Sequence, residues 1–562
     1  MSLLVGKTKE EIKNLIKKSA LEVMKDWGIE NTELSDFVIE VPANREHGDY
    51  AVNAAMVWAR TFKKAPRMVA DAIMEKCNFD GTYIKSYEIA GPGFINLFLN
   101  DKYYADIVAD VIVKGKDYGK SNFGEGKKVL VEFVSANPTG PMHIGNARGG
   151  ALGDCLAAVL SAAGYYTERE FYINDAGNQI NKFGLSLDLR YLQLYKDGIE
   201  MPEDSYHGDD IIAHAKAFAE IYGNSFIDKS EDERRKALVE FALPKNIKGL
   251  EEDLGKYRIT YDTWFKESTL HNNGETMRIV ELLKQSGYTY TQEGALWFKA
   301  TEFGCDKDFV LVRANGVPTY VVPDIAYHYN KLVTRGFDKA IDILGADHHG
   351  YVPRLKAALT ALGVDSSKLD VVLMQMVRLV RDGEVIKASK RSGKAITLVT
   401  LLDEVPIDAA RFFFNLREPN SHFDFDLDLA VNESNSNPVY YVQYAYARIC
   451  SIIRNLEAEG IKRQDATPVM LSKLSAAEER ELIIHIAALT DEIIVSAKAY
   501  DPARITHYVQ ELATKFHKFY AACRVKGDDQ ELMQARLNLC FATATVIKNM
   551  LDLMKIYTPE KM

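Results

Sequence analysis

The sequence predicts a multidomain α/β protein, in which a parallel-sheet domain with an insertion follows an α+β domain and precedes an all-α helical bundle. Three observations lead to this prediction. The chain has 562 residues, which is too long for a single hydrophobic core. Strand-like and helical segments alternate through its middle, as in βαβ units. Helical periodicity then continues without strand signals to residue 562. We therefore expect domains at 1–117, 118–430 (with the insertion at about 185–300) and 437–562.

The composition is that of an ordinary globular protein, with 47% hydrophobic and 26% charged residues. No apolar run reaches 18 residues and the first residues do not resemble a signal peptide, so we expect no membrane span and a cytoplasmic location. The six cysteines form no Cys-x-x-Cys pair, which favours free thiols over zinc sites or disulfides. Because the net charge is −10, binding of nucleic acid would require local basic patches.

The first domain shows helical patterns over about 8–26 and 50–77, with a strand-like run at Val38–Pro42 between them. A second strand follows the Gly91–Gly93 turn. The Gly/Lys-rich stretch Lys114–Lys128 is the best boundary to the next domain. No catalytic constellation is visible in this part of the chain.

The stretch Val129–Gly164 carries the strongest signal in the chain. It begins with a buried strand, continues through a loop rich in Pro and Gly, and ends in a helix. Glu132 interrupts the apolar strand, and a buried carboxylate costs several kcal/mol unless it is paired. The loop and the start of the helix offer free amides and a favourable dipole to an anion, so we expect a phosphate site there.

A second strand at Arg169–Ile173 completes a βαβ unit and therefore predicts a parallel sheet. Residues of about 185–300 are mostly helical and charged, which favours an insertion that interrupts the sheet. The sheet is expected to resume at Phe309–Arg313 and to continue at Ala340–Leu344 and Val371–Met374. Ligands gather where such strands end. The polar residues at predicted strand ends are His143, Asp324, Asp347, His348 and His349.

Two later segments suggest contacts with phosphate or nucleic acid. Six cations face two acids between Arg378 and Lys394; such a run usually marks a solvated face, and phosphate binding is the alternative. The helix that begins at Asn437-Pro438 concentrates tyrosines, which are either core residues or platforms for stacking bases. Its tyrosines, Gln443 and Arg448 crowd one short segment.

Two motifs resemble the signatures of the class I aminoacyl-tRNA synthetases: His143-Ile144-Gly145-Asn146 and Lys387-Ala388-Ser389-Lys390-Arg391. The segments Ser135–His143, Asn174–Gly177 and Gly345–Gly350 are more specific and resemble the arginyl-tRNA synthetases, of the bacterial type. So do Thr319-Tyr320 with Asp324–His328, the tyrosine-rich helix and the final residues. The likeness spans nearly the whole chain. In the general class a second histidine replaces Asn146 and a methionine replaces Ala388; Asn146 fits the bacterial subfamily, and Ala388 would alter only the loop's packing.

The resemblance implies a Rossmann-like catalytic domain that activates L-arginine with ATP and transfers it to the 3′-terminal adenosine of tRNA(Arg). Mg²⁺ would arrive with ATP, since no protein metal site is visible, and the family usually acts as a monomer. The implied catalytic residues are His143, Lys387, Lys390 and Arg391. The implied ATP-binding residues are His143, Gly145, Asn146, Gly345, Asp347, His348, Lys387, Ser389 and Lys390. The implied arginine-binding residues are Glu132, Ser135, Ala136, Asn137, Asn146, Tyr320, Asp324 and His349. The implied tRNA-binding residues are Tyr440, Gln443, Tyr444 and Arg448.

Three other functions were weighed. A different class I synthetase, or a ligase derived from one, would favour a zinc-thiolate cluster or a large editing insertion, and neither is visible. A non-catalytic tRNA-binding protein predicts degraded signatures, whereas the lysines of the second signature are intact. A nucleotidyltransferase would lack the helical bundle. For Glu132, the alternative to arginine binding is an ion pair with a structural arginine.

Overall fold

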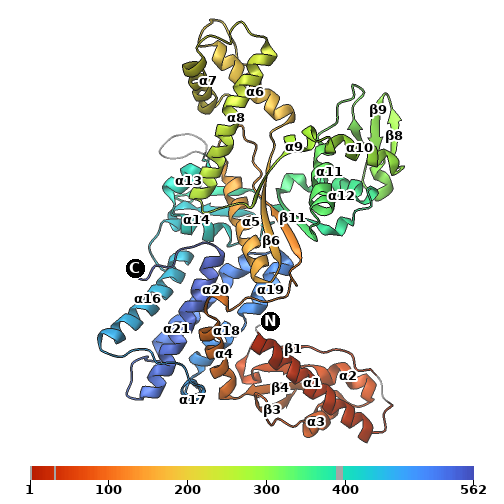
Figure 1. The fold of residues 1–562 in the computed structure, drawn as a ribbon. Helices are drawn as coiled ribbons and strands as arrows, with labels where there is room; N and C mark the ends of the chain where they lie inside the picture. Colours follow the sequence, from red (N-terminus) through yellow and green to blue (C-terminus); the bar gives the residue numbers. More distant parts are fainter. Residues whose placement is uncertain (1–2, 31–32, 43, 388–395) are drawn as a thin grey trace.

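The computed structural model describes residues 3–30, 33–42, 44–387 and 396–562. A central sheet lies between a helical bundle and two excursions of the chain, one built around α6–α8 and one around α9–α11 (Figure 1). The N-terminal unit lies beside the bundle, away from the excursions. Among the described residues, no helix is both long and apolar enough to cross a bilayer.

The central sheet is doubly wound and fully parallel. Its spatial order is β12-β11-β5-β6-β7, so the chain runs outward from β5 in one direction and then outward from β11 in the other. The switch point, where ligands bind in such sheets, therefore lies between β5 and β11. The strands are β5 (Lys128–Glu132), β6 (Tyr166–Ile173), β7 (Thr263–Lys266), β11 (Lys339–Gly345) and β12 (Leu369–Met374).

The prediction of one insertion at about 185–300 is wrong, because β7 returns to the central sheet within that range. Two excursions replace it. The first consists of α6 (Gly177–Leu192), α7 (Asp209–Tyr222) and α8 (Glu231–Lys256), and it has a hydrophobic core of its own. The second consists of α9 (Glu267–Asn272), α10 (Glu275–Gln285), β8 (Thr289–Gln292), β9 (Ala295–Phe298), β10 (Phe309–Val312) and α11 (Val321–Tyr329). Its core is shared with the central sheet through Ala340 and Leu369, and with α12 (Val352–Ala361), the helix that connects β11 to β12.

Two predicted strands in this region differ in the structure. β10 pairs with β9 in a separate antiparallel sheet and does not join the central one. The sequence could not distinguish the two sheets, because a half-buried strand has the same hydrophobic pattern in either. The run that precedes Asp324 is the start of helix α11 and not a strand end. Pro323 does not interrupt this helix, because proline is tolerated in the first turn, where the N–H groups have no partner within the helix. Asp324 therefore projects from a helix.

The N-terminal unit is α+β as predicted, with different internal boundaries. The single helix predicted over 50–77 is a strand followed by two helices, which separate where Lys63 adopts a left-handed φ of 50°. Helix α4 (Asp101–Lys114) belongs spatially with the bundle, since it packs on α17, α18 and α21. The other elements are α1 (Leu3–Asp26), β1 (Ile39–Glu40), β2 (Tyr50–Val52), α2 (Ala54–Phe62), α3 (Pro66–Lys76), β3 (Ile84–Ala90) and β4 (Phe94–Leu99).

The rest of the chain is a small sheet and the helical bundle. Asn437 caps the first bundle helix as predicted, because its side chain accepts hydrogen bonds from Val439 N and Tyr440 N. The small sheet contains β13 (Val377–Arg381), β14 (Glu384–Ile386) and β15 (Phe423–Asp426), with α13 (Leu398–Glu404), α14 (Ile407–Phe414) and α15 (Leu427–Ala430) beside it. The bundle contains α16 (Pro438–Ala458), α17 (Pro468–Leu471), α18 (Ala477–Ala487), α19 (Leu489–Ala499), α20 (Ala503–Ala522) and α21 (Gln530–Leu553).

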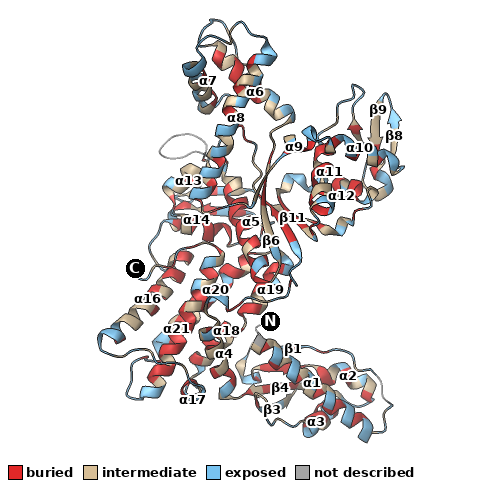
Figure 2. Cartoon of the chain, viewed as in Figure 1, coloured by how far each residue is buried: buried red, intermediate tan, exposed pale blue. Residues whose placement is uncertain are grey.

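Most residues of helix α5 (Ile144–Ala162) are buried (Figure 2). Glycines allow it to approach β5 closely. A Cβ on Gly153 would lie 2.1 Å from Cγ of Phe133, the residue that follows β5. The small residues of α5 thus determine how near its N-terminus comes to the end of β5.

We expect Gly153→Ala to lower the unfolding free energy by about 1–3 kcal/mol, because the added methyl group forces Phe133 or α5 to move. Thermal unfolding of the purified variant measures the loss. The control is Gly249→Ala in α8, where an added Cβ meets nothing within 4 Å and alanine favours the helix. Equal midpoints for the two variants would contradict the expectation.

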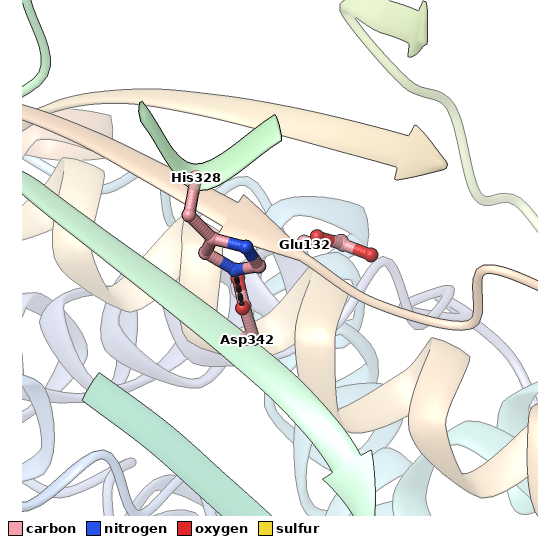
Figure 3. A group of neighbouring side chains, drawn as sticks. All are labelled: Glu132, His328 and Asp342. Atoms are coloured by element: carbon pink, nitrogen blue, oxygen red, sulfur yellow. Dashed lines mark hydrogen bonds and ion pairs between the residues drawn. The ribbon is translucent and has the colours of Figure 1, made fainter. Parts of the chain in front are cut away.

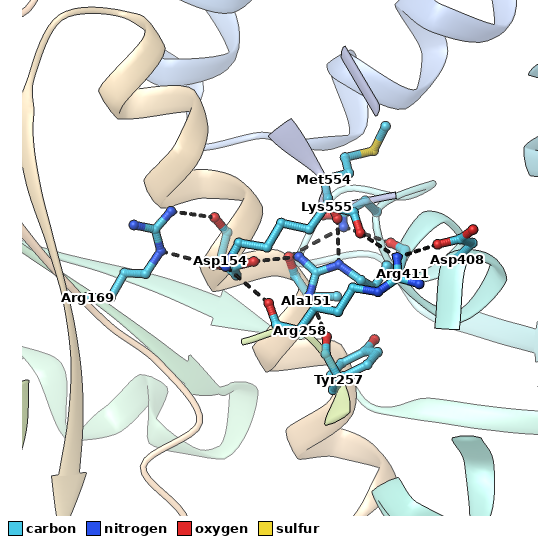
Figure 4. A network of polar contacts seen from close by, with 10 residues as sticks. Ala151, Asp154, Arg169, Tyr257, Arg258, Asp408, Arg411, Met554 and Lys555 are labelled. Atoms are coloured by element: carbon cyan, nitrogen blue, oxygen red, sulfur yellow. Dashed lines mark hydrogen bonds and ion pairs between the residues drawn. The ribbon is translucent and has the colours of Figure 1, made fainter. Parts of the chain in front are cut away.

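A buried ionic network holds α5 against the bundle (Figure 4). Asp154 on α5 has no exposed surface and pairs with Arg411 at 2.5 Å, Lys555 at 2.9 Å and Arg169 at 3.0 Å. Burial would raise the pKa of Asp154, but these cations outweigh it and lower that pKa. Arg411 also donates to the Met554 carbonyl at 2.5 Å, so residues just beyond α21 are bound to the central domain.

Asp154→Asn should lower stability by about 3–5 kcal/mol, because it leaves buried cations without their partner. The contribution of Asp154 is present above about pH 3.9, the pKa of an unfolded aspartate, and is lost as the pH falls through the lower folded-state pKa. Thermal unfolding at neutral and acidic pH tests this. The matched control, Asp424→Asn, breaks the exposed pair with Arg378 and should cost less than about 1 kcal/mol.

Candidate active site at the switch point of the sheet

Two buried carboxylates face each other at the switch point. In the register of β5 and β11, Glu132 pairs directly with Asp342. Glu132 is 6% exposed and Asp342 is 2% exposed. Helix α11 covers them and brings His328 to 2.6 Å from Asp342 (Figure 3). Two such acids repel each other strongly in a dry interior, so cations must accompany them.

Lys331 supplies the second cation. Its Nζ lies 2.5 Å from Glu132 Oε2 and 2.9 Å from Asp342 Oδ1, and the residue has no exposed surface. The alternative that Glu132 has a structural ion-pair partner is therefore correct, although the partner is a lysine and not an arginine. Ser135 Oγ donates to the other oxygen of Glu132 at 2.8 Å.

The protonation states follow from these contacts. Burial raises the pKa of Glu132, and Lys331 only partly opposes it. For Asp342, burial also acts upward, but Lys331 and His328 outweigh it and lower its pKa. Burial and Lys331 lower the pKa of His328, whereas Asp342 and Asp324 together raise it to about 10, so His328 is protonated at neutral pH.

Glu132, His328 and Asp342 also have the spacing of a metal site, since one ligand atom from each lies within 4.8 Å of the others. The ammonium of Lys331 already contacts both carboxylates of this set. It provides the positive charge that a metal ion would bring, so the arrangement is satisfied by side chains alone.

Asp324 forms the open end of this cluster, and its side chain is 30% exposed. Its carboxylate accepts from Tyr351 at 2.5 Å and lies 3.1 Å from His328 Nδ1. Burial would raise the pKa of Asp324, but His328 and Tyr351 lower it. Tyr320, which is 74% exposed, stacks on Tyr351. Tyr351 thus contacts both Asp324 and Tyr320.

The backbone after β5 is strained. Val134 and Ser135 have φ values of 71° and 42°, in the left-handed region that β-branched residues avoid. Such strain costs about 1–3 kcal/mol a residue and is found mainly at functional sites. The turn directs Ser135 Oγ back to Glu132, while Ala136 is half-buried and Asn137 is exposed near Asn174.

The first signature starts helix α5. His143 is exposed at the N-cap, and its backbone N–H donates to the side chain of Asn146 at 2.9 Å. Asn146 therefore closes the helix start, a role that its short amide suits. Gly145 lies in the same first turn, and an added Cβ there would meet nothing within 4 Å.

The second signature begins next to the first. Lys387 follows β14 and is exposed, while Ala388, Ser389, Lys390 and Arg391 lie outside the described residues. Where the description resumes, Thr397 forms a β-bridge with His143, and Leu398 N donates to Met142 O at 2.9 Å. This contact brings the segment that follows the second signature against the loop that carries the first.

The Gly345–Gly350 segment forms a short 3₁₀ turn directly after β11. Gly345 caps the turn, and Asp347, His348 and His349 are all exposed in it. Because β11 is the neighbour of β5, this turn and the His143 loop leave the same edge of the sheet. The predicted ATP residues thus flank the switch point.

The predicted tRNA residues lie on α16 but differ in their contacts. The Gln443 amide is engaged internally, donating to Asp408 at 3.0 Å and to the Tyr557 carbonyl at 2.8 Å. The half-buried rings of Tyr440 and Tyr444 stack on each other, and Arg448 donates to the hydroxyl of Tyr444 at 2.6 Å. In the basic segment, Arg378 and Arg381 form ion pairs with Asp424 and Glu404.

Sequence reasoning missed Lys331, Asp342 and Tyr351. A signal for two of the cations was present, because Asp324, His328 and Lys331 recur at the i, i+4, i+7 spacing of one helix face. This helical spacing conflicts with the prediction of a strand end before Asp324, which the structure shows to be helix α11. Asp342 resembled Glu132, since it is also an acid inside an apolar strand.

A doubly wound parallel sheet with the first signature at its switch point fits the class I aminoacyl-tRNA synthetases that the sequence resembles. Family descriptions agree and are more specific. Residues 8–99 match the arginyl tRNA synthetase N terminal domain, residues 107–434 match the class I (R) tRNA synthetase catalytic domain, and residues 442–562 match the DALR anticodon binding domain.

Known proteins give the same result over the full length. The chain is 54% identical to the arginine–tRNA ligase of Caldanaerobacter subterraneus subsp. tengcongensis and 51% identical to that of Acetivibrio thermocellus, with 100% of each chain covered. The solved arginyl-tRNA synthetase of Thermus thermophilus shares the fold, with a TM-score of 0.73 at 20% identity over 98% of this chain and 100% of that one. The chain belongs to the arginyl-tRNA synthetase family, and it activates arginine and charges tRNA for translation.

Proposed function

We propose that the switch point binds L-arginine and ATP side by side, and that the arginyl-adenylate forms between them. One observation carries this proposal. Three carboxylates (Glu132, Asp342 and Asp324) face two cations (Lys331 and His328), so one negative charge remains in an enclosed site. A guanidinium group supplies the missing charge and offers several N–H donors to carboxylate and hydroxyl oxygens.

The open end of the cluster receives the side chain of the substrate in this proposal. Asp324 and Tyr320 contact the guanidinium group, and Glu132 contributes through the lone pairs that Lys331 and Ser135 leave free. The backbone end of arginine meets the strained turn and the start of α5. The residues proposed there are Ser135, Ala136, Asn137, Asn146 and His349.

ATP occupies the other side of the switch point. His143, at the exposed start of α5, donates to the phosphates, where the free amides and the helix dipole also favour negative charge. Mg²⁺ enters with the nucleotide and neutralises its phosphate charge. The other proposed ATP residues are Gly145, Asn146, Gly345, Asp347, His348, Lys387, Ser389 and Lys390, with Arg391 beside them in catalysis.

The reaction has two steps and no covalent enzyme intermediate. The carboxylate oxygen of arginine attacks the α-phosphorus of ATP, and pyrophosphate leaves. The 2′-hydroxyl of the 3′-terminal adenosine of tRNA(Arg) then attacks the arginyl carbonyl; AMP leaves with the bonding electrons, and the hydroxyl proton passes to solvent. The protein contributes positioning and charge stabilisation: His143 and the Lys387 segment face the phosphates, while Asp324 fixes the amino acid.

The bundle contacts the tRNA in this proposal. Tyr440, Tyr444 and Arg448 form a stacked, cationic group on α16 that suits unpaired bases. Gln443 joins them through its carbonyl oxygen only, since its amide nitrogen is occupied. A monomeric state and a cytoplasmic location stay predictions.

ATP–pyrophosphate exchange with each amino acid, with and without tRNA(Arg), tests the proposal. Exchange should require arginine and should increase with tRNA(Arg), as the family resemblance implies. Exchange with another amino acid, together with none for arginine plus tRNA(Arg), would overturn it.

His143→Ala should slow adenylate formation by about 10²-fold, because a preorganised donor to the phosphates is lost. Single-turnover kinetics with saturating arginine and ATP measures this step. His207→Ala is the control, since His207 is equally exposed but lies in the first excursion, between α6 and α7. An unchanged rate for His143→Ala would remove this residue from the proposed chemistry.

Asp324→Asn should raise the KM for arginine by at least about tenfold and leave the KM for ATP nearly unchanged, because an ionised acceptor becomes neutral at the amino acid side only. The control is Glu302→Gln, an exposed acid in the same excursion. If both KM values rose equally, the proposed division of the site would be wrong.

A further inference from the structure

We propose that Lys331 is a positioning residue that sets the charge of the arginine site and thereby its preference for a substrate with one positive charge. This inference rests on the proposed arginine-binding role of the switch point. It adds a residue that touches neither substrate in the proposal, because it is fully buried beneath the carboxylates.

The geometry places Lys331 at the centre of the cluster. Asn330–Thr334 is a π-helical turn that continues α11, a rare geometry that is often found at functional sites. The turn directs Nζ between Glu132 on β5 and Asp342 on β11, at 2.5 Å and 2.9 Å. The ring of Tyr327 covers the ammonium, with its centroid 4.1 Å away. Lys331 thus bridges two strands from a third element.

The charged groups around Lys331 explain its effect. Besides Glu132 and Asp342, Glu170 on β6 also raises the pKa of Lys331. Glu170 accepts from Tyr327 at 2.7 Å and pairs with Arg335 at 2.6 Å, so it adds no net charge. With Lys331 in place, three carboxylates face two cations, and its ammonium opposes the burial that raises the pKa of Glu132 and orients that carboxyl to accept from a guanidinium group.

Without Lys331, the balance changes. Glu132 and Asp342 would face each other with only His328 as a partner, and two buried like charges seldom both ionise. The proton would settle on Glu132, because burial raises its pKa and Asp342 raises it further, whereas Lys331 lowers it. A neutral Glu132 accepts more weakly from a cation, so arginine affinity would come to depend on pH.

The test is Lys331→Met, a neutral side chain of similar length, in the full-length enzyme with tRNA(Arg). Arginine KM is measured by ATP–pyrophosphate exchange between about pH 6 and about pH 9, where a buried Glu without its cation titrates. The ratio of variant to wild-type KM cancels the ionisation of arginine itself. We expect a ratio of at least about tenfold at the acidic end that declines as the pH rises and Glu132 ionises, with the ATP KM unchanged.

Two further variants separate this role from simple destabilisation. Lys331→Arg keeps the positive charge and should keep the KM ratio independent of pH. The double variant Lys331→Met with Asp342→Asn removes one charge of each sign, so Glu132 ionises again, the pH dependence disappears and the KM returns toward the wild-type value. The double variant also keeps the test usable if Lys331→Met alone does not fold.

Lys555→Met is the matched control, because Lys555 also pairs with a buried carboxylate, Asp154, but outside the switch point. It should lower stability and leave the KM ratio independent of pH. The inference would be overturned if Lys331→Met folded and its ratio of variant to wild-type arginine KM were as independent of pH as that of Lys555→Met. It would also be overturned if this KM ratio depended on pH equally in Lys331→Met and in the double variant. If wild-type enzyme failed to activate arginine, the proposed function would fail before any variant was compared.

Discussion

The constraint on which this structure depends is the pair of carboxylates at the switch point. Glu132 and Asp342 stand opposite each other on adjacent strands, where water does not compensate their charge. Only a cation from outside the sheet allows both to remain ionised. Helix α11 meets this need with His328 and Lys331, and it can do so only if its π-helical end packs over the sheet edge. The position of Asp324 on the same helix follows from that packing.

Helix α5 links this charge cluster to the phosphate side of the site. Its N-terminus presents His143, its middle rests on Phe133 through Gly153, and Asp154 on the same helix is bound by Arg411 and Lys555. One rigid element therefore connects the nucleotide loop, the strand of Glu132 and the junction with the bundle. Close-packed interiors transmit strain, so a shift of the bundle would displace the start of α5.

Much of this site was predictable from the sequence, because strong local signals define it. The buried strand, the Pro/Gly loop and the helix of residues 129–164 have distinct patterns, and the three-domain arrangement followed from periodicity. The predictions that failed concern elements whose structure depends on tertiary contacts. β7 is four residues long and joins the sheet only through β6, and α11 begins with a proline-containing turn that looked extended. The partner of Glu132 lies 199 residues away in the chain, which no local pattern reveals.

The wide separation of the central strands affects how the chain folds. Lys128, at the start of β5, is tied to Asp338, 210 residues later, so the pairing at the middle of the sheet closes a long loop of chain. Closing a loop of disordered chain costs entropy, and contacts of this range slow folding. The first excursion has a hydrophobic core of its own, so it can become ordered first and shorten the effective loop. The strands that carry the catalytic centre would then pair late, after the parts of the chain that separate them have condensed.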